Sequence, residues 1–189
     1  MKIKLLLFCL IMPLFAMALR HAEILGVPID GTISEFSKEL EAEGIKTDWT
    51  STQQYGQGEA RWFTGSFYGR NCSFIAYYIP SSKIVYRVKV FIDMDWISLS
   101  TCEQRVEEIK DELSDKYHIV FEKSKFEGYT AWIGYVRELV PVQGTDYLAA
   151  DSIGWVDIYM SWDNGYTIYV DFYDKQNYLK NKEYLDTTF

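Results

Sequence analysis

The chain has 189 residues, of which 48% are hydrophobic and 17% aromatic, enough to bury one sizeable core. It carries 19 Lys and Arg against 27 Asp and Glu, a formal net charge of -8 at pH 7. This negative charge disfavours nucleic acids and anionic membrane surfaces as partners.

Residues 1–18 have the pattern of a secretory signal peptide. Two early lysines precede an apolar run over 5–15, and Ala16-Met17-Ala18 supplies the small-x-small motif at which signal peptidase cuts. The run is shorter than the roughly 20 residues of a transmembrane helix, and Pro13 interrupts it. We therefore expect an exported mature domain, residues 19–189, that is periplasmic or extracellular and has no stable membrane insertion after cleavage.

Two cysteines remain after this cleavage, Cys72 and Cys102. An oxidising compartment would allow a disulfide between them, but a domain of this size is stable without one, and free cysteine is also readily buried. The sequence leaves both states open.

The first predicted helix runs from about residue 33 to 43. Thr32 and Glu35 have capping-box spacing at its start, and Gly44 is placed to end it. Beyond it the apolar period changes to two, the period of a strand. This pattern predicts a short strand over 45–49, a loop over 50–58, and three hairpin-connected strands over 60–68, 72–79 and 83–92.

The same order then starts again. Ser100 and Glu103 have capping-box spacing, which predicts a second helix ending near His118. Asn164-Gly165 is typical of a tight hairpin. We expect strands over 119–122, 129–138, 153–162 and 166–173, followed by a polar, frayed tail over 176–189.

The fold class follows from this order of helix, short strand and three long strands. We predict an α+β protein of two helix-plus-antiparallel-sheet units, with the helices packed on one sheet face. The units cover residues 27–95 and 97–174 and are either structural repeats within one domain or a coincidence of element order.

Three short motifs carry a resemblance to known proteins: Gly26-Val27-Pro28-Ile29-Asp30-Gly31-Thr32, Gly65-Ser66-Phe67-Tyr68-Gly69 and Tyr173-Asp174-Lys175. They resemble a group of small exported bacterial α+β proteins of unassigned function. The twice-repeated element order is also distantly similar to the beta-lactamase inhibitor protein fold. That resemblance implies a concave, protein-binding sheet but assigns no functional residue, and that family has two helical segments per unit where this sequence predicts one.

No catalytic or cofactor-binding motif is present: the chain lacks a nucleophile elbow, a zinc-type cysteine spacing and a phosphate-binding glycine loop. Two carboxylate pairs, Asp93 with Asp95 and Asp171 with Asp174, lack the spacing of a calcium loop. We interpret both pairs as solvated strand ends and expect no enzyme activity, no cofactor and no metal.

The aromatic residues give the stronger signal. The chain has 6 Trp, 15 Tyr and 11 Phe, more than one ordinary sheet face would bury. Alternation along the strands separates an aliphatic face, suited to carry the helices, from a face of Trp, Tyr, Arg, Lys and Asp. The second face has the composition of a binding surface, although a second sheet could also bury it.

We therefore expect a non-catalytic binding protein whose aromatic face contacts another envelope or extracellular protein. The alternative is a carbohydrate-binding module of the cell envelope that uses the same rings. The candidate binding residues are Trp62, Tyr68, Tyr77, Trp132, Tyr169 and Tyr173.

Overall fold

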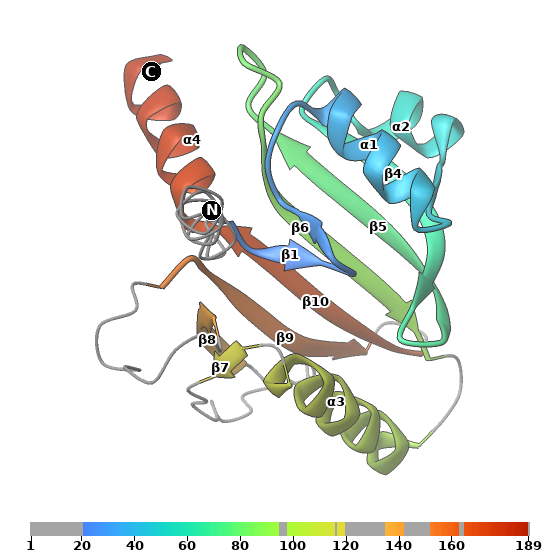
Figure 1. The fold of residues 1–189 in the computed structure, drawn as a ribbon. Helices are drawn as coiled ribbons and strands as arrows, with labels where there is room; N and C mark the ends of the chain where they lie inside the picture. The colour runs from blue at the N-terminus through green and yellow to red at the C-terminus, as the bar shows by residue number, and fades with distance from the viewer. Residues whose placement is uncertain are drawn as a thin grey trace, which may run out of the picture.

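The computed structural model describes residues 21–94, 98–115, 117–119, 135–141, 152–162 and 165–188. Within them the protein has α+β architecture, with one eight-stranded antiparallel sheet, a separate two-stranded sheet, and helices packed against the large sheet (Figure 1). This confirms the predicted fold class. The expected signal peptide and Trp132 lie outside the described residues.

The first half of the chain has one long helix and three long strands. The capping box of Thr32 and Glu35 is formed at the start of the helix, as predicted, and Gly44 adopts a φ of 84° just beyond its end. The elements are β1 (Glu23–Ile24), β2 (Val27–Pro28), α1 (Ile33–Ala42), β3 (Lys46–Thr47), α2 (Trp49–Tyr55), β4 (Ala60–Phe67), β5 (Arg70–Tyr78) and β6 (Val85–Asp93).

The second half has the same main order, with one further helix at its end. Its elements are α3 (Leu99–Ser114), β7 (Tyr117–Ile119), β8 (Tyr135–Pro141), β9 (Gly154–Trp162), β10 (Tyr166–Asp174) and α4 (Lys175–Thr188).

The two halves join edge to edge in the large sheet. The strand order is β3-β4-β5-β6-β10-β9-β8-β7, so the last long strand of each half lies at the centre. Seven antiparallel residue pairs, from Thr167↔Asp93 to Tyr173↔Arg87, form this seam. The short strands β3 and β7 lie at the two outer edges, where short strands limit unwanted edge pairing.

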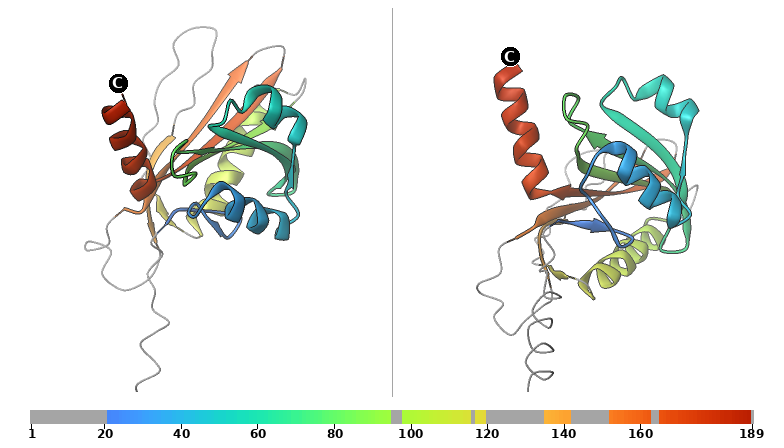
Figure 2. Two further views of the ribbon diagram at one scale, coloured as in Figure 1. Left: turned by 90° about the horizontal axis from the view of Figure 1, so that it is seen from above. Right: turned by 45° about the horizontal axis from the view of Figure 1, so that its top comes forward.

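One core runs under both halves. Alternate residues of the five long central strands form a buried apolar face of aliphatic and phenylalanine side chains, which the apolar sides of α1 and α3 complete. Figures 1 and 2 show how these helices lie against the sheet. Cross-strand register places Phe74 beside Val90, Val90 beside Val170, and Val170 beside Ile158. Because all four side chains are completely buried, the seam between the halves is as well packed as each half.

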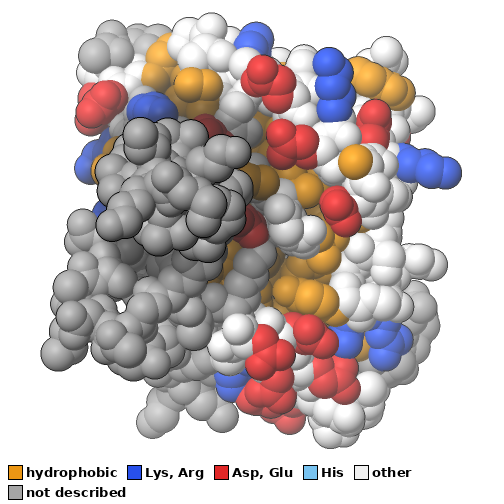
Figure 3. Space-filling model, in the orientation of Figure 1, with side chains coloured by type: hydrophobic (Ala, Val, Ile, Leu, Met, Phe, Trp, Pro, Cys, Tyr) orange, Lys and Arg blue, Asp and Glu red, His pale blue; other side chains and the backbone are white. Residues whose placement is uncertain are grey.

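The outer surface of α3 is strongly acidic. Figure 3 shows carboxylates gathered over α3. The exposed members are Glu103, Glu107, Glu108, Asp111 and Glu112.

Three local expectations were wrong. The predicted loop after residue 49 contains α2, which buries none of its side chains and so leaves no helical period in the sequence. The second helix is capped by Ser98 rather than Ser100, and it ends at Ser114, before His118. The polar tail forms α4.

The segment around His21 is tied to the end of β10 at one end of the sheet. Asp174 is completely buried and accepts hydrogen bonds from the amides of Ala22 and Asn177, while its Oδ2 lies 3.0 Å from Nδ1 of His21. His21 Nε2 lies 3.3 Å from Asp30. This cluster connects the β1–β2 segment to the junction of β10 and α4.

None of the helices in the described segments is long and apolar enough to cross a membrane.

Candidate functional site: the aromatic face of the sheet

The sheet face opposite α1 and α3 carries rings and charges in register. Three cross-strand rows follow from the pairing of β4, β5, β6, β10 and β9. One row is Thr64, Ser73, Phe91, Tyr169 and Tyr159; the second is Trp62, Ile75, Lys89, Asp171 and Asp157; the third is Ala60, Tyr77, Arg87, Tyr173 and Trp155. We call this surface the aromatic face.

A buried ion pair lies at its centre. Arg87 donates from Nε to Oδ1 of Asp171 at 2.8 Å and from a terminal nitrogen to Oδ2, so the pair is bidentate. Lys89 Nζ lies 3.6 Å from the same carboxylate, whose side chain is only 3% exposed. Burial alone would lower the pKa of Arg87, but the hydrogen bonds and the charge attraction to Asp171 outweigh this effect and raise the pKa of Arg87. The arrangement fixes both cations in place.

Two pairs of rings stack across β9 and β10. Tyr159 and Tyr169 stack with centroids 4.7 Å apart and planes 8° from parallel, and Trp155 and Tyr173 stack at 4.8 Å and 12°. These distances equal the spacing between neighbouring strands, so the rings of each pair lie against each other like adjacent plates. The hydroxyl of Tyr173 donates a hydrogen bond to Oδ2 of Asp171 at 3.3 Å, which ties this stack to the buried carboxylate.

The cations also hold the rings. Arg87 lies 4.6 Å from the ring centroid of Tyr77 and 5.0 Å from that of Tyr173. Lys89 Nζ lies 5.3 Å from the centroids of both Tyr159 and Tyr169. Cation–π attraction thus supports the same side chains that stack on each other, which leaves this part of the face little rotamer freedom.

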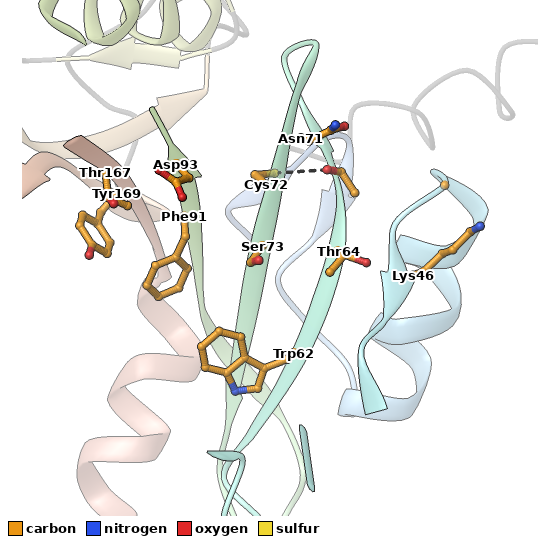
Figure 4. A pocket seen from close by; sticks show the side chains of 12 residues that line it. Lys46, Trp62, Thr64, Asn71, Cys72, Ser73, Phe91, Asp93, Thr167 and Tyr169 are labelled. Atoms are coloured by element: carbon orange, nitrogen blue, oxygen red, sulfur yellow. Dashed lines mark hydrogen bonds between the residues drawn. The ribbon is translucent and has the colours of Figure 1, made fainter. Parts of the chain in front are cut away.

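Trp62 is oriented differently. It belongs to β4, yet its ring centroid lies 5.8 Å from that of Phe91 on β6, with planes 21° apart, although β5 lies between these strands. Figure 4 shows the indole broadside, reaching across β5. Its strand partner Ile75 faces the same side and is only 4% exposed, so the indole lies over this side chain.

A hollow of about 770 Å³ lies beside Trp62 (Figure 4). The first row of the aromatic face has large rings on β6 and β10, Phe91 and Tyr169, but only the short side chains of Thr64 and Ser73 on β4 and β5. The hollow exists because these short side chains leave space next to the indole. Its lining also includes Gly44, Lys46, Gly65, Asn71, Cys72, Asp93 and Thr167.

Burial changes the acidity of several groups on this face. It raises the pKa of Tyr159 to about 12, and burial together with Asp171 raises the pKa of Tyr173. Burial also raises the pKa of the thiol of Cys72, which lines the hollow, to about 12. All three groups are protonated at neutral pH, so the Cys72 thiol is not activated.

The structure brings four of the six predicted binding residues together. Trp62, Tyr77, Tyr169 and Tyr173 are on the aromatic face, and each is partly exposed. Tyr68 is not: it has a φ of 45° at the β4–β5 turn, and its ring packs against the core beside Phe67. Strand alternation stops at such a turn, so Tyr68 does not continue the face of Trp62.

Sequence reasoning missed three rings of this face, Phe91, Trp155 and Tyr159. The available signal was strand alternation. Phe91 lies two residues after Lys89 and therefore on the same face of β6. Trp155 and Tyr159 lie two residues before and two residues after Asp157, so they share one face of β9. Applying the period of two to the whole of both strands would have identified all three rings.

The interpretation of Asp171 and Asp174 as solvated strand ends was wrong, because both carboxylates are buried. Asp171 lies on the aromatic face, where it pairs with Arg87, whereas Asp174 lies in the cluster around His21. Asp93 is exposed and lines the hollow, and Asp95 lies outside the described residues, so the interpretation of that pair stays a prediction. Among the described side chains no group of three or more His, Cys, Asp or Glu is arranged to hold a metal ion. Cys72 and Cys102 are both free thiols in this structure.

No protein-family model matches this chain, and neither the curated proteins nor the solved structures compared with it include a match. The two resemblances drawn from sequence therefore stay predictions.

Proposed function

We propose that this chain is an exported, non-catalytic binding protein that contacts another envelope or extracellular protein through the aromatic face. The observation that carries the proposal is the two ring stacks, Trp155 with Tyr173 and Tyr159 with Tyr169. Stacked tyrosine and tryptophan side chains supply large contact area and lose little conformational entropy on binding.

Charge and exposure support the same surface. The rings of the aromatic face are partly exposed. Two helices contact them through rings of their own: Tyr55 of α2 approaches Trp62, and Tyr178 of α4 approaches Trp155 and Tyr173. Arg87 and Lys89 are already held by Asp171, so a partner does not have to order them. Such preorganisation lowers the cost of association.

The stacks favour a protein over a polysaccharide on β9 and β10. A sugar ring packs against the flat face of an aromatic ring, and in both pairs one face of each ring is covered by its neighbour. The edges of partly exposed stacked rings, in contrast, suit the mixed polar and apolar surface of a protein.

Affinity capture with matched variants tests the proposal. Tagged residues 19–189 are used to capture proteins from envelope and medium extracts, alongside the double variant Trp155→Ser with Tyr159→Ser. Trp49→Ser is the control, because Trp49 is 58% exposed on α2, away from the stacks.

We expect one protein in stoichiometric amount with the wild type and the control, and its loss with the double variant. Circular dichroism checks that the double variant is folded. Recovery of the same proteins by all three chains would contradict the proposal.

A further inference from the structure

The hollow beside Trp62 is a second feature of the aromatic face, and its chemistry differs from that of the stacks. It combines one broadside ring, short hydroxyl side chains, and an amide and a carboxylate at its border. We propose that it binds one pyranose unit of a neutral glycan. This site goes beyond the protein-binding role proposed above and does not depend on it.

The indole of Trp62 supplies the platform. The indole lies over Ile75, is partly exposed and lines the hollow, and Tyr55 of α2 approaches the ring with centroids 5.9 Å apart. A pyranose with equatorial hydroxyls has a flat face of C–H groups that packs against such a ring. Phe91, nearly parallel to Trp62, extends the apolar wall.

The hollow also has the polar groups that a sugar needs. Thr64 and Ser73 place hydroxyls on its floor, and Asn71 and Asp93 supply an amide and a carboxylate. Hydroxyls both donate and accept hydrogen bonds, an amide does the same through two groups, and a carboxylate accepts from sugar hydroxyls. A mainly apolar wall with a few polar groups is typical of small-ligand sites.

Charge excludes the acidic polysaccharides. The hollow is lined by one carboxylate, Asp93, and one ammonium group, Lys46, so its own charges balance. The whole chain has a net charge of -8, which repels a polyanion and leaves the binding of a neutral sugar unaffected. The geometry thus points to uncharged, equatorially substituted units such as glucose or N-acetylglucosamine in β-linkage.

The test is titration calorimetry of the mature chain with cellobiose and with N,N′-diacetylchitobiose. Polygalacturonate serves as the anionic comparison. Two variants probe the hollow: Trp62→Ala removes the platform, and Thr64→Phe fills the floor at an exposed position without removing a core contact. Trp49→Ala is the matched control for loss of a tryptophan.

We expect saturable one-to-one binding of at least one disaccharide and none of polygalacturonate. Each hollow variant should weaken binding about tenfold or more, equivalent to about 1.4 kcal/mol, and Trp49→Ala should leave it unchanged. Thr64→Phe decides the outcome if Trp62→Ala fails to fold.

Two results would overturn the proposal: no saturable binding of either disaccharide, or binding that survives Thr64→Phe. Neither result bears on the protein-binding proposal, because that depends on Trp155 and Tyr159 of β9. Loss of capture in that double variant with intact sugar binding would separate the two activities.

Discussion

At the scale of single residues, the aromatic face depends on one buried carboxylate. Asp171 is the shared partner of Arg87 and Lys89, and these cations in turn contact the rings of both stacks. A change at Asp171 should therefore affect folding as well as the surface.

Asp171→Asn should lower the free energy of unfolding by about 3 kcal/mol, which is the lower end of the cost of breaking a buried ion pair. We expect the lower end because the side chain of Arg87 is 25% exposed, so water can solvate part of its charge when Asp171 is replaced. Lys89→Met should cost less, since Nζ lies 3.6 Å from the carboxylate. Urea denaturation of both variants measures the difference. Equal losses would contradict the central role of the Arg87–Asp171 pair.

The cysteine thiols give a second prediction. Burial raises the pKa of Cys72 to about 12 and also raises that of Cys102, so native protein at pH 8 should react very slowly with a thiol reagent. Unfolded mature chain should release two reactive thiols. Rapid native reaction would contradict this account, and no reaction after unfolding would show that the two cysteines form a disulfide.

The same shift sets a pH dependence. Because the pKa of Cys72 is higher in the folded chain than in the unfolded chain, its burial contributes stability below about pH 8.5, the pKa of a free thiol. That contribution declines as the pH rises toward 12. Urea midpoints between pH 7 and pH 10 should therefore fall less in Cys72→Ser than in wild type.

At the scale of elements, strands were predictable and helices without a clear apolar face were not. The strands β4, β5, β6, β9 and β10 lie close to their predicted ranges, because period-two alternation follows directly from one buried sheet face. The helix α2 has no buried side chain, and α4 has a weak apolar pattern, so neither produces a helical period.

The same limit applies to the site. Alternation identified Trp62, Tyr77, Tyr169 and Tyr173 as members of one face. The hollow was not predictable, since it depends on Trp62 crossing β5 over Ile75, next to the short side chains of Thr64 and Ser73, which is a property of packing between strands. Sequence patterns specify which face a residue occupies but not the conformation of its side chain.

Capping of α3 allows a direct comparison. Sequence spacing favours Ser100, whereas in the structure the hydroxyl of Ser98 accepts from the amide of Thr101. Ser98→Ala should therefore lower the free energy of unfolding by about 1 kcal/mol, and Ser100→Ala should have a much smaller effect. Thermal denaturation of the two variants distinguishes the caps, and a larger loss for Ser100→Ala would favour the sequence interpretation.

At the scale of the whole molecule, the two halves share one sheet and one core. The seam pairs Ile92 with Ile168, and both side chains are buried. We therefore expect a single cooperative unfolding transition, with coincident curves from calorimetry and circular dichroism.

Ile168→Ala tests this cooperativity. It should lower the free energy of unfolding by about 3 kcal/mol, because it leaves a cavity at the seam. The transition should shift without splitting. Two separate transitions, in the wild type or in this variant, would show that the halves fold independently.

The central claim, that the aromatic face meets a partner protein, is tested most directly by photo-crosslinking. Benzoylphenylalanine replaces Tyr159 on that face in one chain and Asp111 on the outer side of α3 in another. We predict that position 159 crosslinks one protein in envelope or medium extracts and that position 111 does not. No crosslink at position 159, or the same product from both positions, would contradict the account.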